Sequence, residues 1–261
     1  KYPVFSVSML LTAIRSVALF GGIFLLPLFL QQLKGLSAIQ SGLMMLPGTL
    51  IIAVALPIAG WLSDKVSPRF LSFIGMLCLA YSMYVYRDIS IYMSNWEIIA
   101  PTMIRGIGMS LLMAPIMTLA LNSVPRRSAG MASSMMSIIQ QVGGAVGIAI
   151  LSMVLDSRNK FHMSTVGSTI KANSPAFLSA TQGLFHRAQE IGLSHANSAL
   201  AAKTALFKHI AVAECSFAFQ DAFIVATFLI LLSLIPVYLL PNRPILHHPE
   251  EMVPKGIVLV D

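Results

Sequence analysis

The chain has 261 residues, of which 56% are hydrophobic and only 10% are charged. A soluble domain carries about 25% charged residues, so this composition excludes an ordinary soluble protein and indicates a membrane protein. The net charge of +7 at neutral pH raises the alternative of a nucleic-acid partner. We exclude that alternative because the basic residues are spread over the turns and one long polar segment, and they form no patch on a soluble face.

Apolar stretches of about 20 residues, the length that crosses a bilayer as a helix, recur along the chain. They predict six membrane-spanning helices at about Val4–Leu30, Ala38–Leu62, Arg69–Tyr86, Trp96–Asn122, Gly130–Leu155 and Ala222–Leu240. Between the last two we expect a long loop, Asp156–Gln220, with an amphipathic helix at about Asn197–Phe219. The predicted fold is an all-α membrane protein with a six-span domain over residues 1–245 and a tail over residues 246–261.

Serines mark the expected starts of three helices. Two of them precede Gln or Glu by three residues, which is the capping-box pattern, and the third stands directly before a proline at the first helical position. These signals are Ser37 with Gln40, Ser94 with Glu97, and Ser67 before Pro68.

Basic residues in the short turns predict the orientation. The turns after the second and fourth helices carry basic pairs, Lys65 with Arg69 and Arg126 with Arg127, whereas the opposite short turns carry one basic residue each. Short loops rich in Lys and Arg stay in the cytoplasm. We therefore expect both ends of the chain inside the cell, the segment Asp156–Gln220 outside, and the protein in the cell (inner) membrane.

A weak internal repeat relates the first three helices to the last three. An arginine, a proline and the serine that opens the next helix recur at offsets of 90, 88 and 91 residues: Arg15, Pro27 and Ser37 correspond to Arg105, Pro115 and Ser128. The helices that carry the arginines run in opposite directions. The pattern therefore predicts two inverted three-helix repeats, although three landmarks also allow coincidence.

The turn Gly60–Arg69 reads Gly-Trp-Leu-Ser-Asp-Lys-Val-Ser-Pro-Arg. It resembles the signature loop of the major facilitator superfamily of transporters, with Ser67-Pro68 where many relatives have Gly-Arg. Most of the chain also resembles the C-terminal half of the fourteen-span drug:proton antiporters of the EmrB/QacA type. The stretches that carry this second resemblance are Phe24–Gln32, Ser41–Pro47, Arg105–Gly108, Gln140–Gly147 and Asp221–Phe223.

The resemblance implies a gating role for the turn that contains Gly60, Asp64, Lys65 and Arg69. We expect Asp64 to lie where the third helix begins, where the positive end of the helix dipole favours a carboxylate by roughly 0.3–1 kcal/mol. Gly60 is expected to let a neighbouring helix approach closely. The alternative is an ordinary charged turn.

Arg15 and Arg105 each lie about ten residues inside a predicted span. Because a buried cation costs at least ~2.5–3.5 kcal/mol on insertion scales, such residues usually face a cavity or a partner. The resemblance places both on helices that line the central cavity, which implies substrate gating or proton coupling. The alternative is a structural arginine satisfied by carbonyl groups.

Other polar and small residues give weaker signals. Gln31, Gln32 and Asp221 are candidates for lining the cavity or accepting a proton, and a solvated helix end is the alternative for each. Gly143 and Gly147 form a Gly-x-x-x-Gly helix-packing pattern. Two isolated cysteines and six histidines without ligand spacing predict no metal site, no cofactor and no catalytic centre.

We therefore expect part of a proton-coupled multidrug exporter that moves lipophilic compounds by alternating access, with the proton gradient as its energy source. The expected partners are the N-terminal half of the same polypeptide, the lipid bilayer, a small lipophilic substrate and, as a candidate, a periplasmic adaptor. The alternatives are a major facilitator that imports or exports a metabolite, and a six-span permease subunit of another transporter class. The same resemblance predicts that this stretch alone inserts into a membrane but does not transport.

Overall fold

The computed structural model describes residues 3–169, 175–190 and 194–238. These residues form α-helices and short 3-10 helices, and no strand occurs among them. Six helices are long and apolar enough to cross a membrane, which confirms the predicted all-α membrane fold. In chain order the helices are α1 (Pro3–Gln32), α2 (Ala38–Lys65), α3 (Pro68–Val85), η1 (Tyr86–Asp88), α4 (Asn95–Asn122), η2 (Arg126–Ser128), α5 (Ala129–Thr169), α6 (Pro175–Glu190), α7 (His195–Leu232) and α8 (Leu234–Val237).

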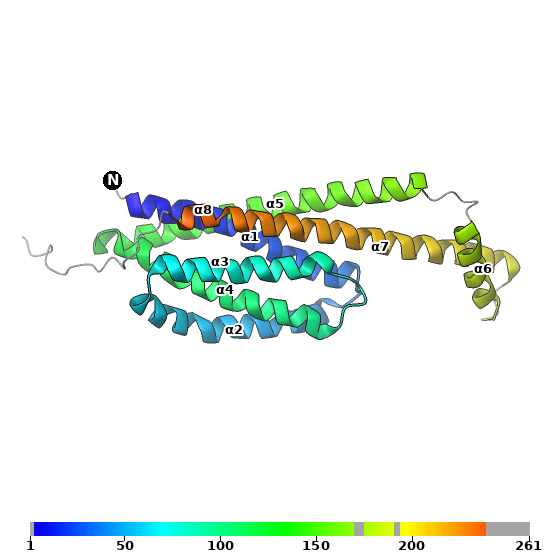
Figure 1. Ribbon diagram of the computed structural model, residues 1–261, viewed down its shortest axis with the longest axis horizontal. Helices are drawn as coiled ribbons and strands as arrows, with labels where there is room; N and C mark the ends of the chain where they lie inside the picture. The colour runs from blue at the N-terminus through cyan, green and yellow to red at the C-terminus, as the bar shows by residue number, and fades with distance from the viewer. Residues whose placement is uncertain (1–2, 170–174, 191–193, 239–261) are drawn as a thin grey trace, which may run out of the picture.

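The long helices lie side by side in an elongated bundle (Figure 1). The start of α1, the α2–α3 turn, the α4–α5 turn and α8 lie at one end, which we call the turn end. The α1–α2 and α3–α4 connections lie at the opposite end. Helices α5 and α7 continue beyond that end and carry α6 at their tip. We call this projecting part, residues 156–169 and 175–190 together with 195–220, the stalk.

The stalk corrects the expected loop Asp156–Gln220, because most of this segment is helical. Helix α5 does not end at Leu155: the sequence turns polar there, but no proline or glycine interrupts it before Gly167. Polar side chains end the apolar span without ending the helix, and the Lys160–Asp156 ion pair, 2.6 Å long, supports the next turn. The expected amphipathic helix and the last span are likewise one helix, α7.

The predicted helix starts at Ser37, Ser94 and Ser67 are confirmed. Both capping boxes are complete, and each serine hydroxyl accepts a hydrogen bond from the backbone N–H three residues later. Ser67 caps α3 in the same way, with Pro68 at its first position. These caps satisfy backbone donors at the helix starts, and they fix where the short connections turn back into the bundle.

Close backbone contacts relate the two halves of the bundle. A Cβ atom on Gly48 of α2 would lie 2.8 Å from the Thr102 carbonyl oxygen of α4. A Cβ atom on Gly143 of α5 would lie 2.8 Å from the Ala13 carbonyl oxygen of α1. In the repeat, α1 corresponds to α4 and α2 to α5. The α2–α4 and α5–α1 contacts are therefore equivalent, as expected for two inverted three-helix units.

A break in the helix lies near the end of the last span. Helix α7 stops at Leu232, four residues before Pro236, because a proline ring clashes with the carbonyl group of residue i−4 and offers no N–H. Ser233 follows as the C-cap and joins α7 to α8. The expected end at Leu240 and the tail over residues 246–261 lie outside the described residues.

Candidate functional site

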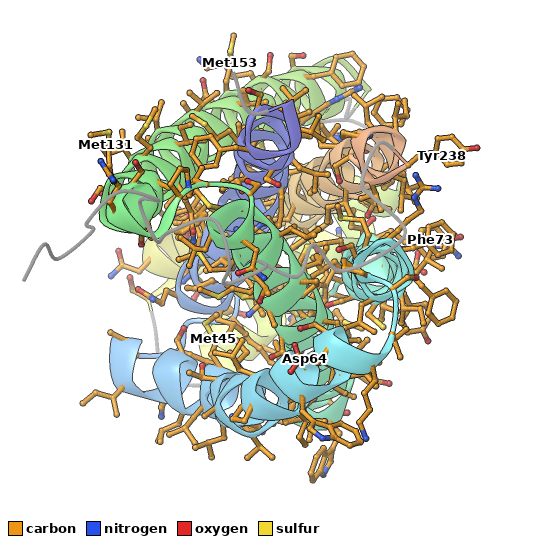
Figure 2. All side chains as sticks on the ribbon, turned by 90° about the vertical axis from the view of Figure 1, so that its left-hand side faces the viewer. Met45, Asp64, Phe73, Met131, Met153 and Tyr238 are labelled. Atoms are coloured by element: carbon orange, nitrogen blue, oxygen red, sulfur yellow. The ribbon has the colours of Figure 1, made fainter. Side chains whose placement is uncertain are left out.

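The charged turn lies at the turn end of the bundle (Figure 2). Asp64 lies in the last turn of α2 and not at the start of α3, because α2 continues to Lys65, beyond its expected end at Leu62. The expected stabilisation of the Asp64 carboxylate by a helix dipole is therefore wrong, since the last turn of a helix carries the negative end of the dipole. Asp64 is exposed and has no ion-pair partner within the part of the chain that the structure describes.

The basic side chains of this turn rest on aromatic rings. Lys65 Nζ lies 3.8 Å from the centre of the Trp61 ring, and the Arg69 guanidinium carbon lies 4.8 Å from that of Tyr238. Both contacts are in the range of cation–π attraction. A Cβ atom on Gly60 would meet no atom within 4 Å, so none of the described helices makes the expected close approach to this residue.

Arg15 and Arg105 are buried among the helices of this bundle, with 3% and 8% of their surface exposed. Arg15 Nε and Nη1 and Arg105 Nη1 have no hydrogen-bond partner among the described residues. The hydroxyl groups of Thr12 and Ser16 beside Arg15 donate to carbonyl oxygens of α1 itself. Both cations therefore lie inside the described six-helix unit.

Two spans are much less buried than the others. Only 17% of the most apolar window of α2 and 22% of that of α5 is buried, against 44–50% for the other four spans. Figure 2 shows Met45 of α2 and Met131 of α5 on one side of the bundle, and Phe73 of α3 and Tyr238 on the opposite side. We call the exposed apolar surface of α2 and α5 the open face. Its large apolar side chains recur every three or four residues: Leu43, Leu46, Leu50, Val54 and Ile58 on α2, and Met131, Met135, Ile138, Val142 and Val146 on α5.

Gly143 and Gly147 face α1 and not the open surface. A Cβ atom on Gly147 would overlap the Val17 carbonyl group, and one on Gly143 would press on Ala13. The Gly-x-x-x-Gly pattern therefore packs two helices of the same unit. Beside this contact runs an apolar groove of about 440 Å³, lined by Met9, Leu10, Ala13, Val17, Ile139, Val142, Gly143 and Val146.

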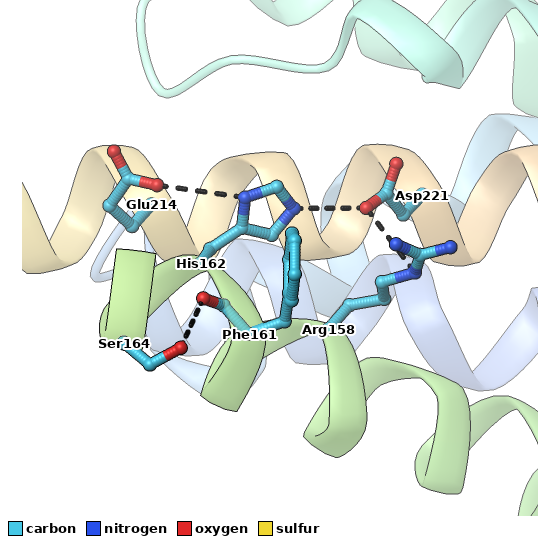
Figure 3. Close-up of polar contacts among 6 residues, drawn as sticks. All are labelled: Arg158, Phe161, His162, Ser164, Glu214 and Asp221. Atoms are coloured by element: carbon cyan, nitrogen blue, oxygen red, sulfur yellow. Dashed lines mark hydrogen bonds and ion pairs between the residues drawn. The ribbon is translucent and has the colours of Figure 1, made fainter. Parts of the chain in front are cut away.

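A second charged group lies where the stalk leaves the bundle (Figure 3). His162 Nε2 of α5 lies 2.9 Å from Asp221 Oδ2 of α7, and His162 Nδ1 lies 3.7 Å from Glu214 Oε2. Arg158 Nε lies 3.7 Å from the same oxygen of Asp221. Asp221 is thus in the middle of a continuous helix, whereas the sequence placed it at the start of the last span.

Sequence reasoning missed His162 and Arg158 because α5 was expected to end at Leu155. Their spacing of four residues places both on one face of a helix. Glu214 and Asp221 are seven residues apart and also share a face. These two spacings are the signal that, with a longer α5, would have found the contact.

Gln31 and Gln32 lie exposed at the end of α1. Gln32 and Leu33 line a cavity of about 320 Å³ together with Asn159, Met163, Lys208, Ala211, Val212 and Cys215 of α5 and α7. Within the described residues no group of three or more His, Cys, Asp or Glu side chains is placed to hold a metal ion.

Comparison with known proteins places the chain in a family. The sequence model of the Major Facilitator Superfamily matches residues 1–148. The chain is 34% identical over 228 residues to the uncharacterized MFS-type transporter YhcA of Bacillus subtilis, covering 87% of this chain and 43% of that protein. It is 31% identical to the lincomycin resistance protein LmrB of Listeria monocytogenes, covering 63% of this chain and 35% of that protein.

The colistin resistance protein EmrB of Acinetobacter baumannii is 24% identical over 75% of this chain and 38% of its own length. The chain thus spans less than half the length of these relatives. The six apolar spans, the charged turn between α2 and α3 and the match over residues 1–148 agree. The chain belongs to the major facilitator superfamily.

Proposed function

We propose that this chain is the C-terminal six-helix half of a proton-coupled exporter that moves lipophilic compounds out of the cell by alternating access. The open face of α2 and α5 is the observation that carries the proposal. It is apolar, includes Met131 and Met135, and is largely unburied within the chain. A second six-helix half seated there would enclose a cavity between the halves, and rocking of the halves would open it to each side in turn.

The substrate class follows from the same surface. Flexible methionine side chains adapt to ligands of different shape, and an apolar wall suits lipophilic compounds better than sugars or charged nutrients. Two of the relatives are named for resistance to lincomycin and to colistin, which supports a drug as the substrate. The basic turns at the turn end favour a cytoplasmic location for that end.

The direct test uses the full-length protein in everted membrane vesicles or proteoliposomes. We expect uptake of lipophilic cationic dyes into everted vesicles when a proton gradient is imposed, and dissipation of that gradient when a substrate is added. Transport that persists after the proton gradient is abolished would contradict proton coupling. Transport restricted to one polar metabolite would favour the metabolite carrier instead.

Asp64→Asn tests the gating role of the charged turn. We expect at least a tenfold loss of export, equivalent to about 1.4 kcal/mol in the limiting step, with unchanged amounts of protein in the membrane. The reason is that the exposed carboxylate is free to pair with the other half in one state of the cycle. The measurement is the initial rate of dye transport normalised to protein.

The matched control is Asp88→Asn, which removes an exposed carboxylate from a turn at the opposite end. Among the described residues Asp88 pairs with the neighbouring Arg87, 3.0 Å away, so the export rate of this variant should stay near that of the unaltered protein. Full export by the Asp64 variant would reduce the turn to an ordinary connection.

A further inference from the structure

An imidazole between two carboxylates joins α5 to α7 at the base of the stalk (Figure 3). The histidine comes from α5 and both carboxylates come from α7. The side chains are 23% exposed for His162, 19% for Glu214 and 32% for Asp221. They are therefore half-buried, close to water but shielded enough for their charges to interact more strongly than on an open surface.

The two ring nitrogens of His162 make different contacts. A neutral imidazole has one N–H donor, and its other nitrogen presents a lone pair. Nε2 is within hydrogen-bond distance of Asp221 Oδ2, whereas Nδ1 lies 3.7 Å from Glu214 Oε2, which is too far for a hydrogen bond. The neutral ring can therefore donate to Asp221, and the protonated ring keeps that bond and adds an ion pair with Glu214.

The net charge of the cluster depends on the state of the ring. Arg158 contributes one positive charge, and the two carboxylates contribute one negative charge each. With a neutral His162 the cluster carries a net charge of −1 by this count, and with a protonated ring the count is zero. The ring forms ion pairs with the two carboxylates only in its protonated state.

Neighbouring groups shield the ring without competing for its nitrogens. The rings of Phe161 and Phe217 lie 5.6 and 6.0 Å from it, centre to centre. Asp156 and Lys160 of α5 pair with each other on the exposed side. On α7, Lys208 lines the neighbouring cavity.

A cavity lies beside the site at the stalk end of the bundle. Asn159 and Met163, on either side of His162 along α5, line one cavity with Gln32 at the last residue of α1. Gln220 and Ser216 of α7 donate to the carbonyl oxygen of Ile89, which follows η1. The cluster is therefore level with the helix ends and connections.

We propose that His162 is a proton-binding site that senses the acidity of the compartment into which the stalk projects. The ring takes up one proton from water there, and the protonated ring ties α5 to α7 through Glu214 and Asp221. When the proton leaves, the ion pair with Glu214 is lost and the base of the stalk loosens. This property goes beyond the proposed export function and does not depend on it.

Hydrogen exchange of the full-length protein in lipid nanodiscs, without substrate, tests the proposal between pH 5.5 and 8. After correction for the intrinsic exchange rate, we expect amides of residues 156–166 to be protected about tenfold more at the acidic end. His162→Gln keeps one donor and one acceptor, as in the neutral ring. In that variant we expect protection to be independent of pH.

His186→Gln is the matched control, because His186 is an exposed histidine of α6 that contacts the neighbouring Phe185 ring. It should leave the pH dependence unchanged. Asp221→Asn provides a second variant in which the imidazole is intact. In this variant the logarithm of the ratio of amide protection at pH 5.5 to that at pH 8 should fall to half its value in the unaltered protein, or less. Protection that does not change with pH in the unaltered protein, or a pH effect that survives His162→Gln, would overturn the proposal.

Discussion

Gly147→Val is expected to separate α1 from α5 and to destabilise the protein by about 3 kcal/mol or more. At this position a Cβ atom would overlap the carbonyl group of Val17 and lie 2.7 Å from its Cα atom. The obstacle is backbone, so no side-chain rotation relieves it, and the two helices must move apart over their whole contact. The measurement is the thermal unfolding midpoint of the full-length protein in detergent.

Gly130→Val on the same helix is the control, since a Cβ atom there would meet no atom within 4 Å. Both substitutions place a β-branched residue in α5, so any difference between them reports the contact with α1 and not helix propensity. Equal unfolding midpoints for the two variants would show that α1 and α5 do not pack through Gly147.

Arg105→Met is expected to raise stability and to abolish export. The substitution removes a buried cation whose Nη1 atom has no partner among the described residues, and methionine fills much of the same space. Removal of an uncompensated buried charge should raise the free energy of unfolding by on the order of 1 kcal/mol or more. A charge kept at such a cost is expected to serve transport, so export should fall at least tenfold. Arg15→Met should behave in the same way.

Two measurements on the same preparations test this pair of effects: the thermal unfolding midpoint and the initial rate of proton-driven dye transport. Arg187→Met, at an exposed arginine of α6, controls for loss of positive charge and should alter neither. Arg105→Lys keeps the charge but not the planar guanidinium. Unchanged export by both variants at position 105 would assign the arginine a purely structural role.

The sequence predicted those parts of the fold that depend on local chemistry. Ser37, Ser94 and Ser67 mark helix starts because their hydroxyls cap backbone groups within three residues. The six spans follow from apolar length alone.

The predictions that were wrong concern contacts between helices, or helices that continue beyond the apolar stretch that spans the membrane. The strongly apolar stretch ends near Leu155, but α5 continues as a helix to Thr169. The partners of Asp221 lie 59 and 63 residues away on another helix, so no local pattern displays them. Asp64 was assigned to the wrong helix because α2 continues as a helix to Lys65, beyond the apolar stretch that ends at Leu62.

The unbroken passage of α5 and α7 from the bundle into the stalk has a mechanical consequence. Helix α5 has 41 residues, which at about 1.5 Å per residue makes it roughly twice as long as a bilayer core is thick. A stiff rod of that length acts as a lever whose pivot lies in the membrane. When the span tilts, α6 at the tip moves sideways further than any atom at the membrane surface. A molecule bound to α6 therefore opposes tilting of the span more effectively than one bound at the membrane surface.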